Sequence, residues 1–197
     1  MHEDRESRSG SPQRGMFHSD DNATSLSLPD EAATLALGGA LAAALVQEQL
    51  TEVVIGLEGD LGAGKTTLVR GVLRGLGYPG KVTSPTYNLV ELYAISRLNL
   101  YHFDFYRFER PEEYLDAGLD EYFQDSAICL VEWPDKAGVY LPPPDLRLRL
   151  RLAEAEQMGR TAELLAQSEK GRLCLTGLKL CLDHTRDAKS SSSPPPR

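Results

Sequence analysis

The chain has 197 residues, of which 41% are hydrophobic and 25% charged, and its formal net charge is −8. This length suits one domain, and the composition is that of a soluble globular protein. No stretch approaches the roughly 18 consecutive apolar residues of a membrane span. The negative charge argues against general polyanion binding, because such affinity comes mostly from clustered Lys and Arg. We therefore expect no membrane contact, and contact with RNA only locally or through a partner.

Composition separates one folded domain from two tails. Residues 1–25 are rich in Ser, Asp, Glu and Arg without an apolar signal-peptide core, and the chain ends in a stretch of Ser and Pro. We predict disordered tails over residues 1–25 and 183–197, and a folded domain over residues 26–182. The odd number of cysteines, with no CxxC pair, predicts reduced thiols of a cytoplasmic protein, mostly filling the core. These cysteines are Cys129, Cys174 and Cys181.

The first element of the domain is predicted to be a helix that starts near residues 29–31 and runs to about Gln49. Pro in the first turn and the acidic residues after it favour a helix start. Gly38 and Gly39 would let this helix pack closely on a sheet. We expect its packed face to comprise Leu35, Ala36, Gly39, Ala42, Ala43 and Val46.

A phosphate-binding motif follows a short apolar run. Residues 53–57 predict a buried strand, and the next residues match the P-loop pattern Gly-x4-Gly-Lys-Thr, with Lys65 and Thr66 at its end. Glycines allow positive φ angles, which turn backbone N–H groups toward phosphate oxygens. A Gly-rich turn that fits by chance is disfavoured by the strand and the Lys-Thr pair. The predicted phosphate-binding residues are Gly59, Asp60, Leu61, Gly62, Ala63, Gly64, Lys65, Thr66 and Thr67.

A helix over residues 66–76 and an antiparallel hairpin come next. Residues 81–87 are polar and kinked by Pro85, which is typical of a switch loop, and residues 88–94 and 98–107 predict the two strands. Alternation places Asp104 near the end of the second strand and on the same face as His102. We interpret His102 as a structural hydrogen-bonding residue.

A second carboxylate ends a central strand. Residues 127–131 form an apolar run without alternation, typical of a buried parallel strand, and Glu132 follows at the edge where such sheets place ligand groups. We predict that Glu132 faces the P-loop and orients Mg²⁺; the alternative is a strand-end acid that is merely solvated. Whether Trp133 and Tyr87 flank a nucleotide or only pack is left open.

The late strands complete a predicted α/β fold. Residues 145–152 alternate Leu and Arg, and residues 160–168 pair back antiparallel or form a helix. The arginine face, comprising Arg147, Arg149 and Arg151, is either a charged outer face that blocks aggregation or a contact for a partner or RNA phosphate. The fold class that we predict is a three-layer P-loop NTPase domain with a mixed, partly antiparallel central sheet.

Four segments together resemble the TsaE (YjeE) family over about residues 28–152: Gly-Asp-Leu-Gly-Ala-Gly-Lys-Thr-Thr at 59–67, Ser-Pro-Thr-Tyr at 84–87, Tyr-His-Phe-Asp-Phe-Tyr-Arg at 101–107 and Val-Glu-Trp-Pro at 131–134. The resemblance implies a P-loop ATPase that works with the TsaB-TsaD heterodimer in threonylcarbamoyladenosine modification of tRNA, at the adenosine beside the anticodon. It implies that the ATPase is not the transferase and reaches tRNA only through the complex.

The resemblance also implies roles for individual residues. Lys65, Asp104 and Glu132 would be catalytic, with Lys65 on the ATP phosphates and Asp104 on the attacking water. Thr66 and Glu132 would serve Mg²⁺, and residues 83–86 would form a switch-like loop.

Two other functions stay open from the residues alone. One is a small-molecule kinase, although no Arg-bearing helical lid is visible in the sequence; the other is a nucleotide-gated adaptor with negligible turnover. A GTPase is disfavoured because there is no Asn-Lys-x-Asp guanine motif. An arginine finger is not assignable from the pattern: Arg107 is one candidate, and a partner is the other source.

Overall fold

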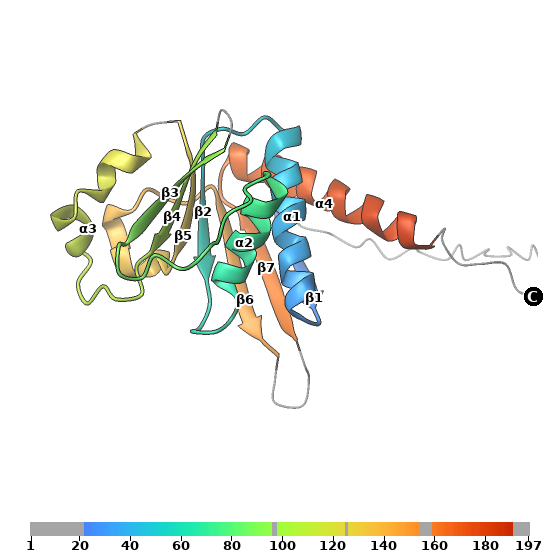
Figure 1. Cartoon of the computed structure of the whole chain (residues 1–197), viewed down its shortest axis with the longest axis horizontal. Coiled ribbons are helices and arrows are strands. Elements are labelled where there is room, and N and C mark those ends of the chain that lie inside the picture. The colour runs from blue at the N-terminus through green and yellow to red at the C-terminus, as the bar shows by residue number, and fades with distance from the viewer. Residues whose placement is uncertain (1–21, 96–97, 125, 154–158, 191–197) are drawn as a thin grey trace, which may run out of the picture.

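A computed structural model describes residues 22–95, 98–124, 126–153 and 159–190. Its core is a mixed sheet with the strand order β1-β7-β6-β2-β5-β4-β3 (Figure 1). The four central strands, from β6 to β4, run parallel, and antiparallel strands extend both edges. The strands are β1 (Ala23–Leu28), β2 (Val53–Glu58), β3 (Val90–Ile95), β4 (Leu98–Asp104), β5 (Ile128–Glu132), β6 (Leu146–Leu152) and β7 (Arg160–Ala166).

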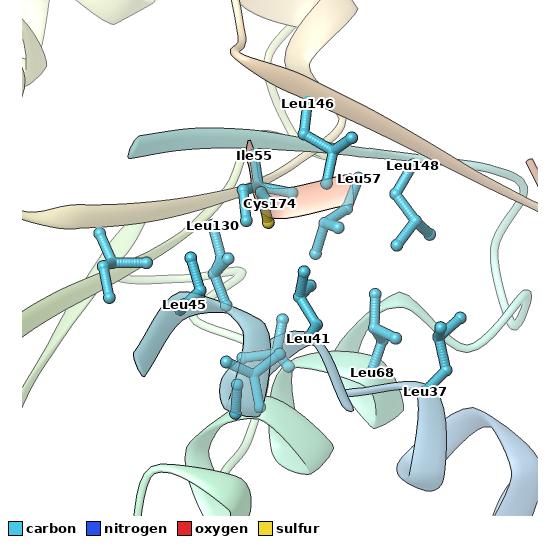
Figure 2. Packing of buried hydrophobic residues seen from close by; sticks show 14 of the residues in the cluster. Leu37, Leu41, Leu45, Ile55, Leu57, Leu68, Leu130, Leu146, Leu148 and Cys174 are labelled. Atoms are coloured by element: carbon cyan, nitrogen blue, oxygen red, sulfur yellow. The ribbon is translucent and has the colours of Figure 1, made fainter. Parts of the chain in front are cut away.

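Helical elements cover the sheet on both sides, so the predicted three-layer α/β fold is confirmed. One face packs on α1 (Glu31–Gln47), α2 (Lys65–Gly75) and α4 (Glu169–Ser190), and Figure 2 shows leucines of α1 and α2 meeting those of β2, β5 and β6. The other face, over β4 and β5, carries an aromatic cluster under the shorter elements. These are α3 (Glu113–Asp116) and the 3-10 helices η1 (Leu119–Phe123) and η2 (Pro134–Tyr140).

The neighbouring strands β2 and β5 are apolar up to their final glutamates because both of their faces are covered. All five residues of β5 are buried, which matches the prediction of a central parallel strand. Residues 160–166 form the strand β7, so the helical alternative for this segment is excluded. Among the described helices, none combines the length and the apolar character that crossing a membrane requires.

The predicted packed face of the first helix was wrong except at Ala42, which is buried. Its core face contains Leu37, Leu41 and Leu45, while Val46 is exposed. A helix that is apolar nearly all round gives little periodic signal, so the sequence does not distinguish its faces. Gly38 lies against α2 and not against the sheet, since a Cβ there would stand 2.8 Å from the Cα atom of Gly71.

The disordered tails predicted over residues 1–25 and 183–197 were both too long. Residues 23–25 belong to β1, which pairs antiparallel with β7, and helix α4 continues past residue 183 to Ser190. The helix start is confirmed, with Asp30 as the N-cap: its Oδ1 accepts a hydrogen bond from the amide of Ala33 at 2.7 Å. The outer parts of both tails, residues 1–21 and 191–197, lie outside the described residues.

Candidate active site

The loop between β2 and α2 forms a cradle of backbone N–H groups. Its three glycines have positive φ angles, 134° at Gly59, 81° at Gly62 and 107° at Gly64, which L-residues with a side chain rarely adopt. Helix α2 begins directly after Gly64, so its free N-terminal N–H groups and the positive end of its dipole point into the loop. This arrangement favours an anion with several oxygens, such as a phosphate chain.

Lys65 lies in this loop and is almost buried, with 4% of its surface exposed. Its Nζ donates hydrogen bonds to the carbonyl oxygens of Gly59 (2.6 Å) and Asp60 (2.9 Å) and lies 3.9 Å from the ring centroid of Trp133. Burial lowers the pKa of Lys65, although the charges of Glu132 and nearby aspartates oppose this effect. A phosphate would replace these neutral acceptors with charged ones.

Glu132, at the C-terminal end of β5, contacts residues of α2 and β4. Its Oε1 accepts a hydrogen bond from the hydroxyl of Thr66 at 2.8 Å and lies 2.9 Å from Nε2 of His102. Glu132 is 3% exposed and His102 is fully buried. His102 Nδ1 has no hydrogen-bond partner among the described residues. The expected proximity of Glu132 to the P-loop is therefore found, and His102 bonds to the carboxylate as a structural residue would.

Asp104 stands beside Glu132, since the two residues are opposite each other in the parallel pair of β4 and β5. Its Oδ1 accepts a hydrogen bond from the amide of Tyr106 at 2.9 Å. Its Oδ2 accepts one from Thr86 Oγ1 at 2.8 Å and another from Ser84 Oγ. These two hydroxyl contacts hold the predicted switch loop against Asp104.

These groups surround one cavity of about 300 Å³. Six of the nine predicted loop residues line it, namely Leu61, Gly62, Gly64, Lys65, Thr66 and Thr67. Gly59 and Asp60 line a second cavity of about 490 Å³, and Trp133 lines both cavities. Ala63 is buried beneath the loop. Trp133 borders both cavities, so its position fits the nucleotide-flanking alternative better than packing alone.

The oxygen donors around the cavity fit a hard divalent cation. Thr66, Glu132 and Asp104 offer a hydroxyl and two carboxylates, and Mg²⁺ prefers such ligands, usually one or two from the protein with the rest from phosphates and water. The loop amides and Lys65 fit the phosphate chain of a nucleotide. The residues present therefore fit both the phosphate chain of a nucleotide and Mg²⁺.

Several residues that line the cavity were not predicted from the sequence. Glu31, Tyr106 and Arg160 border the cavity without having been predicted there. They come from segments far apart in the chain, and only Tyr106, next to the Asp104 segment, carried a local signal. Arg107, the candidate arginine finger, is not among the residues that line this cavity. It stacks on Tyr87, with its Cζ 4.5 Å from the ring centroid.

The arginine face of β6 is occupied by ion pairs within the chain. Arg147 and Arg149 both bind the carboxylate of Glu58, the latter at 2.5 Å, and Arg151 lies 3.3 Å from Glu163. These contacts favour the interpretation of a charged outer face over that of a contact for a partner or RNA phosphate.

The strand, glycine loop, helix and strand-end carboxylates define a P-loop NTPase domain. The family model "Threonylcarbamoyl adenosine biosynthesis protein TsaE" matches residues 28–162. The chain belongs to the TsaE family.

Individual relatives agree with this assignment. The tRNA threonylcarbamoyladenosine biosynthesis protein TsaE of Haemophilus influenzae is 42% identical over 74% of this chain and 90% of its own length. The protein of the same name from Bacillus subtilis is 46% identical over 51% of this chain and 62% of its own. The crystal structure of Bacillus subtilis YdiB superposes with a TM-score of 0.66 at 30% identity, covering 80% of this chain and 95% of that one.

Proposed function

We propose that this protein is an ATPase of tRNA threonylcarbamoyladenosine biosynthesis that acts with a TsaB-TsaD heterodimer and is not itself the transferase. One observation carries the ATPase: Lys65, Thr66, Asp104 and Glu132 converge on one cavity at the P-loop. The pathway is that named for the relatives. The partner and its contact with tRNA follow from the family resemblance.

Each residue has a distinct task in hydrolysis. The loop amides and Lys65 bind the phosphates and offset the negative charge that grows on them in the transition state. Thr66 and Glu132 would hold Mg²⁺, which when bound neutralises phosphate charge. His102 fixes the orientation of Glu132 through its Nε2 contact. Asp104 accepts a hydrogen bond from the attacking water and orients it toward the terminal phosphorus.

The same geometry explains why turnover would depend on a partner. Asp104 already accepts three hydrogen bonds, from Ser84, Thr86 and Tyr106, out of the roughly four that a carboxylate accepts. Because both switch-loop hydroxyls bond to Oδ2, a water that approaches this oxygen would compete with the loop. We infer that the isolated protein hydrolyses ATP slowly and that the heterodimer stimulates it by moving residues 83–86.

A nucleotide-gated adaptor is the second candidate. It is favoured if Ser84 and Thr86 stay bonded to Asp104, because the carboxylate is then less available to an attacking water. Phosphate release from Mg-ATP, measured alone and with TsaB-TsaD, separates the two. The ATPase requires a low basal rate that the heterodimer raises and that Lys65→Ala, Asp104→Ala and Glu132→Ala abolish. ATP-dependent complex formation without phosphate release would establish the adaptor, and failure to bind the heterodimer would overturn the partner.

A further inference from the structure

We propose that Arg160 is a second cationic group of the nucleotide site and that its guanidinium binds the phosphate chain. The inference rests on the proposed function, because it requires that a nucleotide occupies the P-loop. It assigns to the chain itself a phosphate-binding arginine, which neither the sequence pattern nor the position of Arg107 supplies.

The backbone of Arg160 is fixed from two sides. It is the first residue of β7 and pairs with Leu28 of β1 and with Leu152 of β6. The preceding residue, Gly159, has a φ of 116°, and a Cβ there would stand 2.7 Å from the carbonyl oxygen of Leu28. Only glycine allows the chain to pass so close to the end of β1 immediately before Arg160.

The side chain of Arg160 lies directly against the loop. A Cβ on Gly64 would stand 3.2 Å from Nε of Arg160 and 3.6 Å from its Cζ. Gly64 is the residue before Lys65 and caps the N-terminus of α2. Arg160 lines the same cavity as Lys65 and Thr67. The two cations therefore border the place where the loop amides would hold phosphate oxygens.

Among the described residues, Arg160 has no partner for its buried Nε, and no ion pair of its guanidinium is found there. By contrast, Arg147, Arg149 and Arg151 on the adjacent strand all pair with carboxylates. A buried donor left unpaired is costly, and a phosphate oxygen would satisfy it. The planar guanidinium matches phosphate geometry better than a lysine does.

The first test measures ATP affinity. The chain has a single tryptophan, Trp133, at the edge of the cavity, so its fluorescence reports nucleotide binding directly. We expect Arg160→Gln to raise the Kd for Mg-ATP by about ten- to a hundredfold, as for loss of a charge-assisted hydrogen bond, and Arg160→Lys to recover part of the loss. The control is Arg172→Gln, which removes an equal charge from an exposed pair with Glu169 on α4 and leaves the Kd unchanged.

The second test uses the unmodified protein, so it does not depend on how a variant folds. Phenylglyoxal modification of arginines, mapped by peptide mass spectrometry, is expected to slow at Arg160 when Mg-ATP is present and to stay constant at Arg172. A Kd for Arg160→Gln within twofold of the wild type, or modification of Arg160 that ATP does not slow, would overturn the inference. Wild-type protein that binds no ATP, or a Lys65→Ala variant that binds it normally, would instead overturn the proposed function.

Discussion

The hydroxyl of Thr66 donates a hydrogen bond of 2.8 Å to Oε1 of Glu132, which links the first turn of α2 to the last residue of β5. Both groups are oxygen ligands that Mg²⁺ accepts, and they lie close enough together to bind the same cation. The contact therefore marks where a cation would enter between them.

Removing the charge of Glu132 should weaken Mg²⁺ binding more than ATP binding. Glu132→Gln keeps the shape of the side chain and an oxygen that can accept from Thr66, but it no longer offers a negative ligand. We expect the Mg²⁺ dependence of ATP affinity, measured by titration with and without EDTA, to be largely lost. A variant that responds to Mg²⁺ like the wild type would show that Glu132 is not a ligand.

His102 should act on the same cation through Glu132. His102→Phe fills a similar buried volume but removes the Nε2 contact at 2.9 Å. Because loss of an outer hydrogen bond typically costs 10- to 100-fold in metal affinity, we expect about a tenfold fall in apparent Mg²⁺ affinity. ATP affinity in EDTA should hardly change. A fall in both affinities together, with a lower melting temperature, would indicate a general loss of packing instead.

The switch loop should loosen when its hydroxyls are removed. Ser84→Ala with Thr86→Ala deletes both hydroxyl contacts to Oδ2 of Asp104, while the amide of Tyr106 still bonds to Oδ1. We expect faster amide hydrogen exchange over residues 82–89, by mass spectrometry, without faster exchange in β5. Asp104→Ala should reproduce this pattern; unchanged protection of the loop in both variants would contradict it.

Two adjacent glycines of α1 provide a matched pair for stability. A Cβ on Gly38 would overlap the carbonyl oxygen of Leu68 on α2, whereas a Cβ on Gly39 would meet nothing within 4 Å. We expect Gly38→Ala to lower the free energy of unfolding by about 1–3 kcal/mol through overpacking. Gly39→Ala should raise it by up to about 1 kcal/mol through helix propensity. Urea unfolding of both variants decides, and equal effects would refute the close packing of the two helices.

Alkaline pH should destabilise the protein through its buried thiols. Cys129 and Cys174 are 2% and 0% exposed, and burial raises the pKa of each to about 12 from 9.0. Between these values the folded state keeps protons that the unfolded state loses, so stability falls as pH rises above about 9 and is unaffected below it. The urea-unfolding free energy of the wild type, compared with Cys129→Ala/Cys174→Ala, measures this. Equal pH slopes in the two proteins would contradict it.

Thiol labelling provides an independent check on the same burial. In the native protein at pH 8, a thiol reagent should modify Cys181, which is partly exposed, and reach the other two cysteines only on unfolding.

Much of the fold could be predicted because its signals are local. Three local patterns each indicate how a strand is buried: the apolar run before the P-loop, the Leu/Arg alternation of β6 and the apolar residues of β5 before Glu132. The strand β1 was missed because Ala23–Leu28 carries three polar residues and follows a polar segment. Its place in the sheet depends on β7, far along the chain, and no local pattern encodes that pairing.

The residues of the site likewise differ in whether a local sequence pattern predicts them. Lys65, Thr66, Asp104 and Glu132 could be predicted because each sits in a motif or at a strand end, where topology fixes its neighbours. Arg160 could not, since only the register of β7 against β1 and β6 brings it to Gly64. Its single clue is the preceding glycine, and many Gly-Arg pairs have no such role.

The pairing of β1 with β7 also sets an order of assembly on the ribosome. Residues 23–28 leave the exit tunnel before every other strand, yet their hydrogen-bonding partners, residues 160–166, are made more than 130 residues later. The parallel strands β2, β4, β5 and β6 can associate before that, whereas the first strand must wait as an unpaired segment until the last strand arrives. Closure of this edge is therefore a late event in biosynthesis, and the same event carries Arg160 to the P-loop.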